Sequence, residues 1–135
     1  MKRIKTVLLI DDDEPTNFIN KKIIQASDLV EAIHVSNSGQ EALNFLRQED
    51  APPNTFAVPE LIFLDINMPA MDGWEFLAHY KRLKNEQKAK VIIIMLTTSL
   101  NPDDEVKAKG MKEVCAFRNK PLTKQLLEEI AAKYF

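Results

Sequence analysis

Short apolar runs and longer stretches of helical periodicity alternate along this chain. Five runs predict strands, at about Thr6–Ile10, Ala32–Val35, Leu61–Leu64, Val91–Leu96 and Cys115–Arg118. The run Val91–Leu96 is apolar at every position, which is typical of a strand buried on both faces. With the helical stretches that follow them, these runs predict five strand–helix units. The pattern therefore indicates an α/β fold with a parallel sheet and helices on both faces.

A helix is predicted after each of these runs. Between about Pro15 and Ala26, the apolar residues Phe18, Ile19, Ile23 and Ile24 follow helical spacing. The other helices are expected from Ser38 to about Gln48, after Gly73, from Asn101 to Gly110, and from Thr123 to Phe135. Residues 51–60 contain three prolines and are expected to form a loop.

Reactive polar residues stand where four of the predicted strands end. They are Asp11, Asp12 and Asp13 after the first, Asp65 after the third, Thr97, Thr98 and Ser99 after the fourth, and Lys120 after the fifth. The carboxyl ends of parallel strands share one edge of the sheet, and open α/β sheets bind ligands just outside it. We therefore expect these acids, hydroxyls and the ammonium group to meet in one shallow pocket.

Aspartates gathered at one sheet edge repel each other. Two unit charges 4 Å apart repel by about 4 kcal/mol at an effective dielectric constant of 20. A divalent cation removes this penalty, and Mg²⁺ prefers carboxylate oxygens as ligands. Asp11, Asp12 and Asp65 are therefore candidate ligands of Mg²⁺.

The remaining groups fit phosphoryl transfer, which mainly requires positioning and compensation of charge. Asp65 stands alone at its strand end and is the candidate nucleophile, able to carry a phosphoryl group as a mixed anhydride. Lys120 would supply a second cation, and the Thr97 hydroxyl could donate to a phosphoryl oxygen. No residue of the set is a general acid poised to release the product.

Each segment also has a purely structural interpretation. The three aspartates could be turn and N-cap residues before a helix, Asp13 above all. Thr97 to Ser99 could simply end a strand, and Lys120-Pro121 could be an ordinary loop dipeptide. Their joint occurrence at the strand ends of a five-unit α/β pattern favours the functional interpretation.

Composition narrows the class of protein. The chain has 135 residues, enough for one domain with its own core. Its net charge of -2, with both signs interspersed, argues against nucleic acid or an anionic membrane as partner. No apolar run approaches the roughly 18 residues of a membrane span, and the first residues do not lead into a signal peptide. The single cysteine, Cys115, has apolar neighbours that predict a buried, inert thiol, and a lone cysteine fits the cytoplasm.

Four segments together resemble a known family. They are residues 7–13, 64–73, 95–98 and 119–121, of which 64–73 is the most specific. Through them the chain resembles the receiver domain of two-component response regulators over essentially its whole length. The resemblance implies a flavodoxin-like, doubly wound (βα)5 fold with strand order 2-1-3-4-5. The sequence stops where the fifth predicted helix stops, so that residues 1–135 are expected to form a single receiver domain without an output domain.

The resemblance further implies an acceptor and a metal site. Asp65 would accept the phosphoryl group, and Asp12, Asp65 and the backbone carbonyl of Asn67 would bind Mg²⁺ directly. Asp11 would act on the cation largely through water. Mg²⁺ is the only cofactor implied. Asn67 and Ser99 lie at positions that tune the phosphoryl lifetime in the family.

A conformational switch is implied as well. Thr97 and Lys120 would contact the phosphoryl oxygens, and Phe117 lies at the position of the family's switch aromatic. Phe117 lacks the hydroxyl of the common tyrosine, so that any switch would work by packing alone. Thr98 stands where the family usually has alanine, which makes access to the phosphoryl group tighter.

The implied partners are proteins. The phosphoryl donor would be a sensor histidine kinase or a histidine phosphotransfer protein, and a downstream target would bind the surface of the fourth helix, fifth strand and fifth helix. Such a protein is a signalling phosphoacceptor rather than an enzyme, and catalyses only its own Mg²⁺-dependent phosphorylation and dephosphorylation. The sequence leaves dimerisation open.

Three other functions share part of this pattern. A phosphohydrolase resembling the haloacid dehalogenase superfamily would place a second acid two residues after the nucleophile, where this chain has Asn67. A flavodoxin would need a phosphate-binding loop where this chain has three aspartates. A receiver-like docking module that is never phosphorylated stays open.

Overall fold

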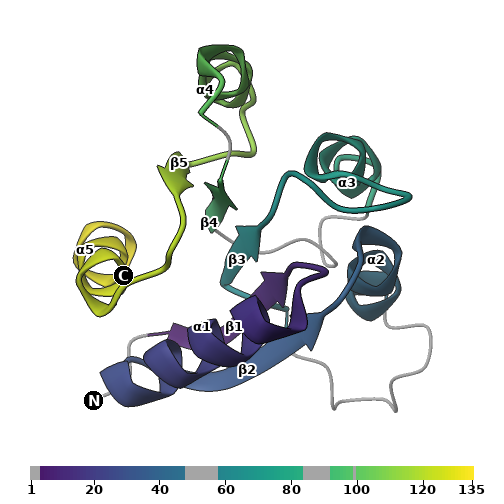
Figure 1. Cartoon of the computed structure of the whole chain (residues 1–135). Coiled ribbons are helices and arrows are strands. Elements are labelled where there is room, and N and C mark those ends of the chain that lie inside the picture. The colour runs from purple at the N-terminus through teal and green to yellow at the C-terminus, as the bar shows by residue number, and fades with distance from the viewer. Residues whose placement is uncertain (1–3, 48–57, 84–91, 99) are drawn as a thin grey trace.

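The computed structural model describes residues 4–47, 58–83, 92–98 and 100–135, in which strands and helices alternate (Figure 1). The strands are β1 (Ile4–Ile10), β2 (Val30–Ser36), β3 (Leu61–Leu64), β4 (Ile92–Thr97) and β5 (Ala116–Asn119). The helices are α1 (Glu14–Ser27), α2 (Gly39–Arg47), α3 (Gly73–Tyr80), α4 (Pro102–Lys109) and α5 (Lys124–Tyr134). Predictions for Gln48, residues 51–57, Val91 and Ser99 fall outside the described residues.

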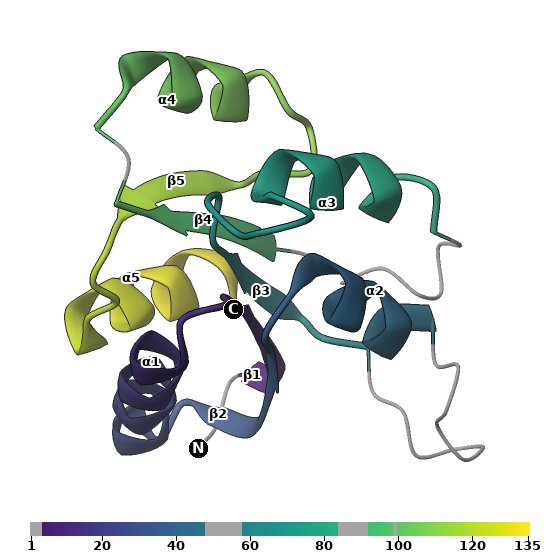
Figure 2. The same cartoon turned by 45° about the vertical axis from the view of Figure 1, so that its right-hand side comes forward.

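All the strand pairs are parallel, and the strand order is β2-β1-β3-β4-β5. This confirms the flavodoxin-like fold expected from the resemblance. Successive side chains of β1 point to opposite faces of the sheet. Leu8 and Ile10 join a core with α2 and α3, whereas Val7 and Leu9 join a second core with α1 and α5. Helices α1 and α5 accordingly cover one face, and α2, α3 and α4 lie over the other (Figures 1 and 2).

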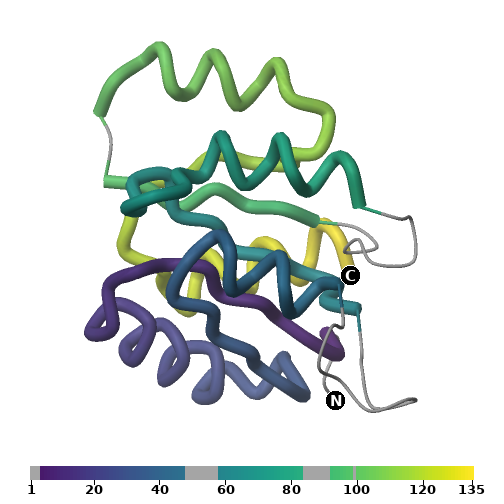
Figure 3. The backbone as a smooth tube through the Cα atoms, turned by 90° about the vertical axis from the view of Figure 1, so that its right-hand side faces the viewer, coloured from purple at the N-terminus to yellow at the C-terminus, as the bar shows by residue number. Residues whose placement is uncertain are grey.

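The carboxyl ends of the strands gather at one edge of the molecule. In the side view of Figure 3 the chain leaves β1, β3, β4 and β5 on the left and turns back there into the following helices. Four of these helices begin with a side-chain cap, provided by Asp13, Asp72, Asn101 and Thr123. The prediction that Asp13 is a cap is therefore confirmed.

Helix α1 buries only part of its apolar residues, and buries two asparagines with them. Asn17, Asn20 and Ile24 are buried, whereas 63% of Phe18 and 54% of Ile19 are exposed. Positions 17, 20 and 24 share one stripe of the helix, because residues three and four apart lie on the same side. Phe18 and Ile19 lie off that stripe, and the Lys22 ammonium approaches the Phe18 ring at 5.3 Å from its centroid.

The prediction of a buried thiol was wrong, because Cys115 is exposed. The residue stands just before β5, which is an edge strand of the sheet. Its backbone N–H donates to the Ile93 carbonyl, 2.9 Å away, while its neighbours Val114 and Ala116 are only half-buried.

Among the helices that the structure describes, none has the length and the apolar character needed to span a membrane.

Candidate functional site

Two aspartates stand directly after adjacent strands of the sheet. The Asp65 N–H donates to the Ile10 carbonyl at 3.0 Å, and the Asp11 N–H donates to the Ser36 carbonyl at 3.2 Å. The sheet hydrogen bonding thus continues one residue past β1 and β3. Asp11 and Asp65 are 5% and 6% exposed, which holds both carboxylates at the rim of the core rather than in free solution.

Asp12 completes an acidic cluster with these two residues. One carboxylate oxygen from each of Asp11, Asp12 and Asp65 lies within 4.8 Å of the other two. Asp12 is exposed, whereas its two partners are buried. Ligands about 2.1 Å from Mg²⁺ lie at most about 4.2 Å apart, so that the three oxygens need to close only slightly around an ion. The donor set therefore fits a hard divalent cation.

Lys120 reaches into this cluster from the chain after β5. Its Nζ lies 2.7 Å from Asp11 Oδ2 and 3.2 Å from Asp65 Oδ1. The Lys120 backbone N–H donates to the Thr97 carbonyl at 2.8 Å, which ties the end of β5 to the end of β4. Thr97 itself is fully buried. The structure thus brings together the residues predicted to form the site from four separate segments.

The electrostatic state of the site follows from burial and from these short distances. Burial raises the pKa of Asp65, and the nearby Asp11 carboxylate raises it further, although Lys120 opposes both effects. For Lys120, burial alone would lower the pKa, but the hydrogen bond and charge of Asp11, together with Asp65, raise it. The ammonium is therefore held in its charged form, and a cation beside the Asp65 carboxylate favours its ionised state.

The turn between β3 and α3 is shaped by Gly73. A Cβ atom at this position would lie 2.7 Å from the Asp65 carbonyl oxygen and 2.9 Å from the Ile66 Cα. The Gly73 N–H donates to the Ile66 carbonyl at 2.8 Å. The chain can fold back this closely onto Asp65 only because glycine has no side chain. Ala70, in the same turn, has a left-handed φ of 66°.

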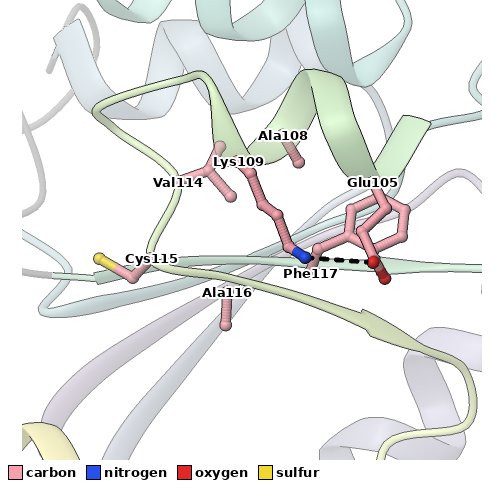
Figure 4. A pocket seen from close by; sticks show the side chains of 7 residues that line it. All are labelled: Glu105, Ala108, Lys109, Val114, Cys115, Ala116 and Phe117. Atoms are coloured by element: carbon pink, nitrogen blue, oxygen red, sulfur yellow. Dashed lines mark ion pairs between the residues drawn. The ribbon is translucent and has the colours of Figure 1, made fainter. Parts of the chain in front are cut away.

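The other predicted residues lie around this centre. The Asn67 and Thr98 side chains are exposed, and Ser99 is outside the described residues. Phe117 is half-buried on β5 and packs against the core beneath α4. It lines a cavity of about 290 Å³ between β5 and α4. Lys109 and Glu105, one turn apart on α4, also line this cavity and form an ion pair at 3.4 Å (Figure 4).

One residue near the site was missed by sequence reasoning. Asn17 is buried on α1, and its Nδ2 donates to the Asp11 carbonyl at 2.8 Å. The only signal in the sequence is the spacing of Asn17 and Asn20 with Ile24, and a polar pair at such a spacing ordinarily predicts a solvated face.

Comparison with known proteins places the chain in a family. The profile of the response regulator receiver domain matches residues 7–132. The response regulator Rcp1 of Synechocystis sp. is 30% identical over 111 residues, which cover 82% of this chain and 74% of that protein.

Two solved structures of response regulators are similar to this chain over nearly its whole length. A two-component response regulator from Cytophaga hutchinsonii has a TM-score of 0.86 and 38% identity, over 98% of this chain and 97% of that chain. The Mn²⁺-bound form of Rcp1 has a TM-score of 0.77 and 26% identity, over 96% of this chain and 93% of that chain.

Proposed function

The chain belongs to the family of response regulator receiver domains, the phosphoacceptors of two-component signalling, and on this basis we propose that Asp65 is its phosphoacceptor. The observation that carries the proposal is the position of the Asp65 carboxylate, buried at the strand edge, 3.2 Å from the Lys120 ammonium and next to two further carboxylates. An oxygen nucleophile with a cation on one side and a metal-binding set of acids on the other suits phosphoryl transfer.

The proposed metal is Mg²⁺. Asp12, Asp65 and the Asn67 backbone carbonyl would bind it directly, and Asp11 would bind through water. The proposal is supported by the close approach of the three carboxylates and by the Mn²⁺-bound form of the related Rcp1. Bound Mg²⁺ would neutralise the acids and the incoming phosphoryl oxygens.

The transfer step proposed for Asp65 balances without a further reactant. A carboxylate oxygen attacks the phosphorus of a phosphohistidine on a sensor kinase or phosphotransfer protein. The new O–P bond forms as the P–N bond breaks, and the imidazole nitrogen keeps the electron pair. Lys120 compensates the added charge, and the Thr97 hydroxyl donates to a phosphoryl oxygen. Hydrolysis of the acyl phosphate by water returns the Asp65 carboxylate.

The output of this reaction is proposed to be a change of surface rather than turnover of a substrate. Inward movement of Thr97 toward the phosphoryl group would free space for Phe117, which is half-buried beside the cavity under α4 (Figure 4). The face formed by α4, β5 and α5 would then present a different shape to a protein target. In this proposal residues 1–135 act as one receiver domain.

Intact-protein mass spectrometry tests the acceptor. After incubation with acetyl phosphate and Mg²⁺, we expect one added phosphoryl group, which is lost when EDTA is present and in the Asp65→Ala variant. An adduct that persists in Asp65→Ala would contradict the assignment. Sustained release of phosphate from small phosphate esters would instead favour a phosphohydrolase. Without an adduct, titration with beryllofluoride followed by Trp74 fluorescence would separate rapid hydrolysis from a docking module.

A further inference from the structure

The buried side chain of Asn17 is bonded to the turn that carries the acidic cluster. Asn17 is 4% exposed, in the first turns of α1. Its Nδ2 donates to the backbone carbonyl of Asp11 at 2.8 Å and to Asn37 Oδ1 at 3.3 Å. The amide thereby links the β1–α1 turn to the chain after β2.

The orientation of this amide is determined by its partners. The Asp11 backbone carbonyl can only accept a hydrogen bond, so a flipped Asn17 amide would place an oxygen against an oxygen there. In the observed orientation Asn17 Oδ1 is buried and has no hydrogen-bond donor among the residues that the structure describes. An apolar side chain of similar size would avoid this unfavourable burial. The amide is therefore a poor choice for packing alone, and its two donated bonds are what it contributes.

The Asp11 carbonyl is the most informative of these contacts, because it belongs to the peptide that joins Asp11 to Asp12. The other polar groups of Asp11 are already held. Its N–H donates to Ser36, its Oδ1 accepts from the Asp13 N–H at 3.0 Å, and its Oδ2 accepts from Lys120. Fixing the carbonyl fixes the peptide plane, and with it the direction in which both aspartate side chains leave the turn.

We propose that Asn17 is a positioning residue for the cation site, acting through the Asp11 carbonyl to hold Asp11 and Asp12 in a metal-binding arrangement. This inference rests on the proposed function of the acidic cluster. Groups that orient metal ligands from behind commonly change metal affinity by 10- to 100-fold when they are removed. Asn17 bonds to the backbone of the turn and not to a carboxylate of the cluster, so that its effect should appear first in cation affinity.

The chain offers a matched control on the same helix. Asn20 is 6% exposed and lies three residues further along α1, and within the described residues it makes no hydrogen bond to the β1–α1 turn. Asn20→Ala and Asn17→Ala each remove one buried amide from one helix. Only Asn17→Ala removes a bond to Asp11. A second variant, Asn17→Leu, keeps the branched shape and the number of side-chain heavy atoms, is somewhat larger, and removes both donated bonds.

Isothermal titration with Mn²⁺ tests the proposal, with the melting temperature in EDTA as a separate measure of stability. We expect both Asn17 variants to bind Mn²⁺ on the order of tenfold more weakly than the wild type, and Asn20→Ala to bind within twofold of the wild type. Wild-type affinity in folded Asn17→Leu would overturn the role of Asn17. An equal loss in Asn20→Ala would also overturn it, because it would indicate general loosening of α1. If the wild type bound no Mn²⁺, the cation site itself would be rejected, and the role of Asn17 with it.

Discussion

Without a bound metal ion, the stability of the acidic cluster depends most strongly on the Lys120 ammonium, which pairs with Asp11 and Asp65. At an effective dielectric constant of 20, charges at 2.7 Å and 3.2 Å from Nζ attract by about 6 and about 5 kcal/mol. Desolvation of the ammonium offsets much of this attraction, since the Lys120 side chain is only 16% exposed. Removing one member of a buried ion pair nevertheless costs about 3–5 kcal/mol, because the remaining charges lose their partner.

We therefore expect Lys120→Met to lower the free energy of unfolding by about 3 kcal/mol at pH 7.5 in EDTA. The loss of stability is limited because protonation of Asp65 removes the negative charge that Lys120 would otherwise neutralise. The pKa of Asp65 is raised in the folded state by burial and by Asp11. A carboxyl group with a raised folded pKa favours folding at low pH and disfavours it as the pH rises through that pKa. Without Lys120 the pKa of Asp65 should rise further, so that the variant should recover stability on acidification to pH 5.5 more than the wild type does.

Urea unfolding followed by Trp74 fluorescence measures both effects, and the variant Lys124→Met is the matched control. Lys124 is exposed and forms no ion pair with the described residues, so its replacement should change stability by less than about 0.5 kcal/mol. Adding Mg²⁺ should stabilise Lys120→Met more than the wild type, because in the variant no ammonium competes with the ion for the carboxylates. A loss below about 1 kcal/mol for Lys120→Met, or a loss independent of pH, would refute this account of the site.

Two further substitutions test the turns that present the acids. Gly73→Ala should lower the free energy of unfolding by about 2 kcal/mol and slow labelling by acetyl phosphate, because the new Cβ would press on backbone atoms at 2.7 Å and 2.9 Å. Gly110→Ala, where the nearest atom is at 3.5 Å, should lose no stability in the same urea titration, and equal losses would count against the argument. Asp13→Ala should lower the melting temperature by removing the α1 cap, whereas Asp13→Asn should retain most of it. Hydrogen bonds from Thr16 lower the pKa of Asp13, so the contribution of its charge should disappear as the pH falls through that lowered value.

The positions of the strands and the meeting of their ends could be predicted from the sequence pattern, whereas the strand order was implied by the family resemblance. Buried parallel strands are continuous apolar runs, and such runs as Leu61–Leu64 coincide with the observed strand. The polar residues that follow them converge because parallel strands end at one edge. Apolar spacing alone was misleading on α1, where Phe18 and Ile19 are exposed and two asparagines are buried. The spacing of apolar residues identifies a helix. It does not determine which side of the helix packs against the sheet when polar side chains can form hydrogen bonds there.

Features that depend on a few tenths of an ångström could not be predicted from the sequence. The bond from Asn17 to the Asp11 carbonyl and the close approach of Gly73 to Asp65 both arise from how two distant segments meet. The segments that carry the family resemblance include Gly73 without explaining why glycine is needed there, and they do not include Asn17. The exposure of Cys115 has a different origin: its apolar neighbours favoured burial, but the strand that follows it lies at the edge of the sheet, as the strand order implied by the resemblance already indicated.

The distances around Lys120 impose an order on the proposed reaction. The ammonium is closer to Asp11 than to Asp65, and it cannot turn fully toward a phosphoryl group on Asp65 while it is the main counter-charge of Asp11. In the proposed site, a cation bound directly by Asp12 and Asp65, and by Asp11 through water, would take over that neutralisation. Lys120 would then be available for a phosphoryl group on Asp65. Because the ion and the ammonium neutralise the same carboxylates, each weakens the interaction of the other with Asp11. The proposed reaction is therefore one exchange of counter-charges between the acidic cluster and the lysine, in which binding of the metal would prepare Lys120 for the phosphoryl group.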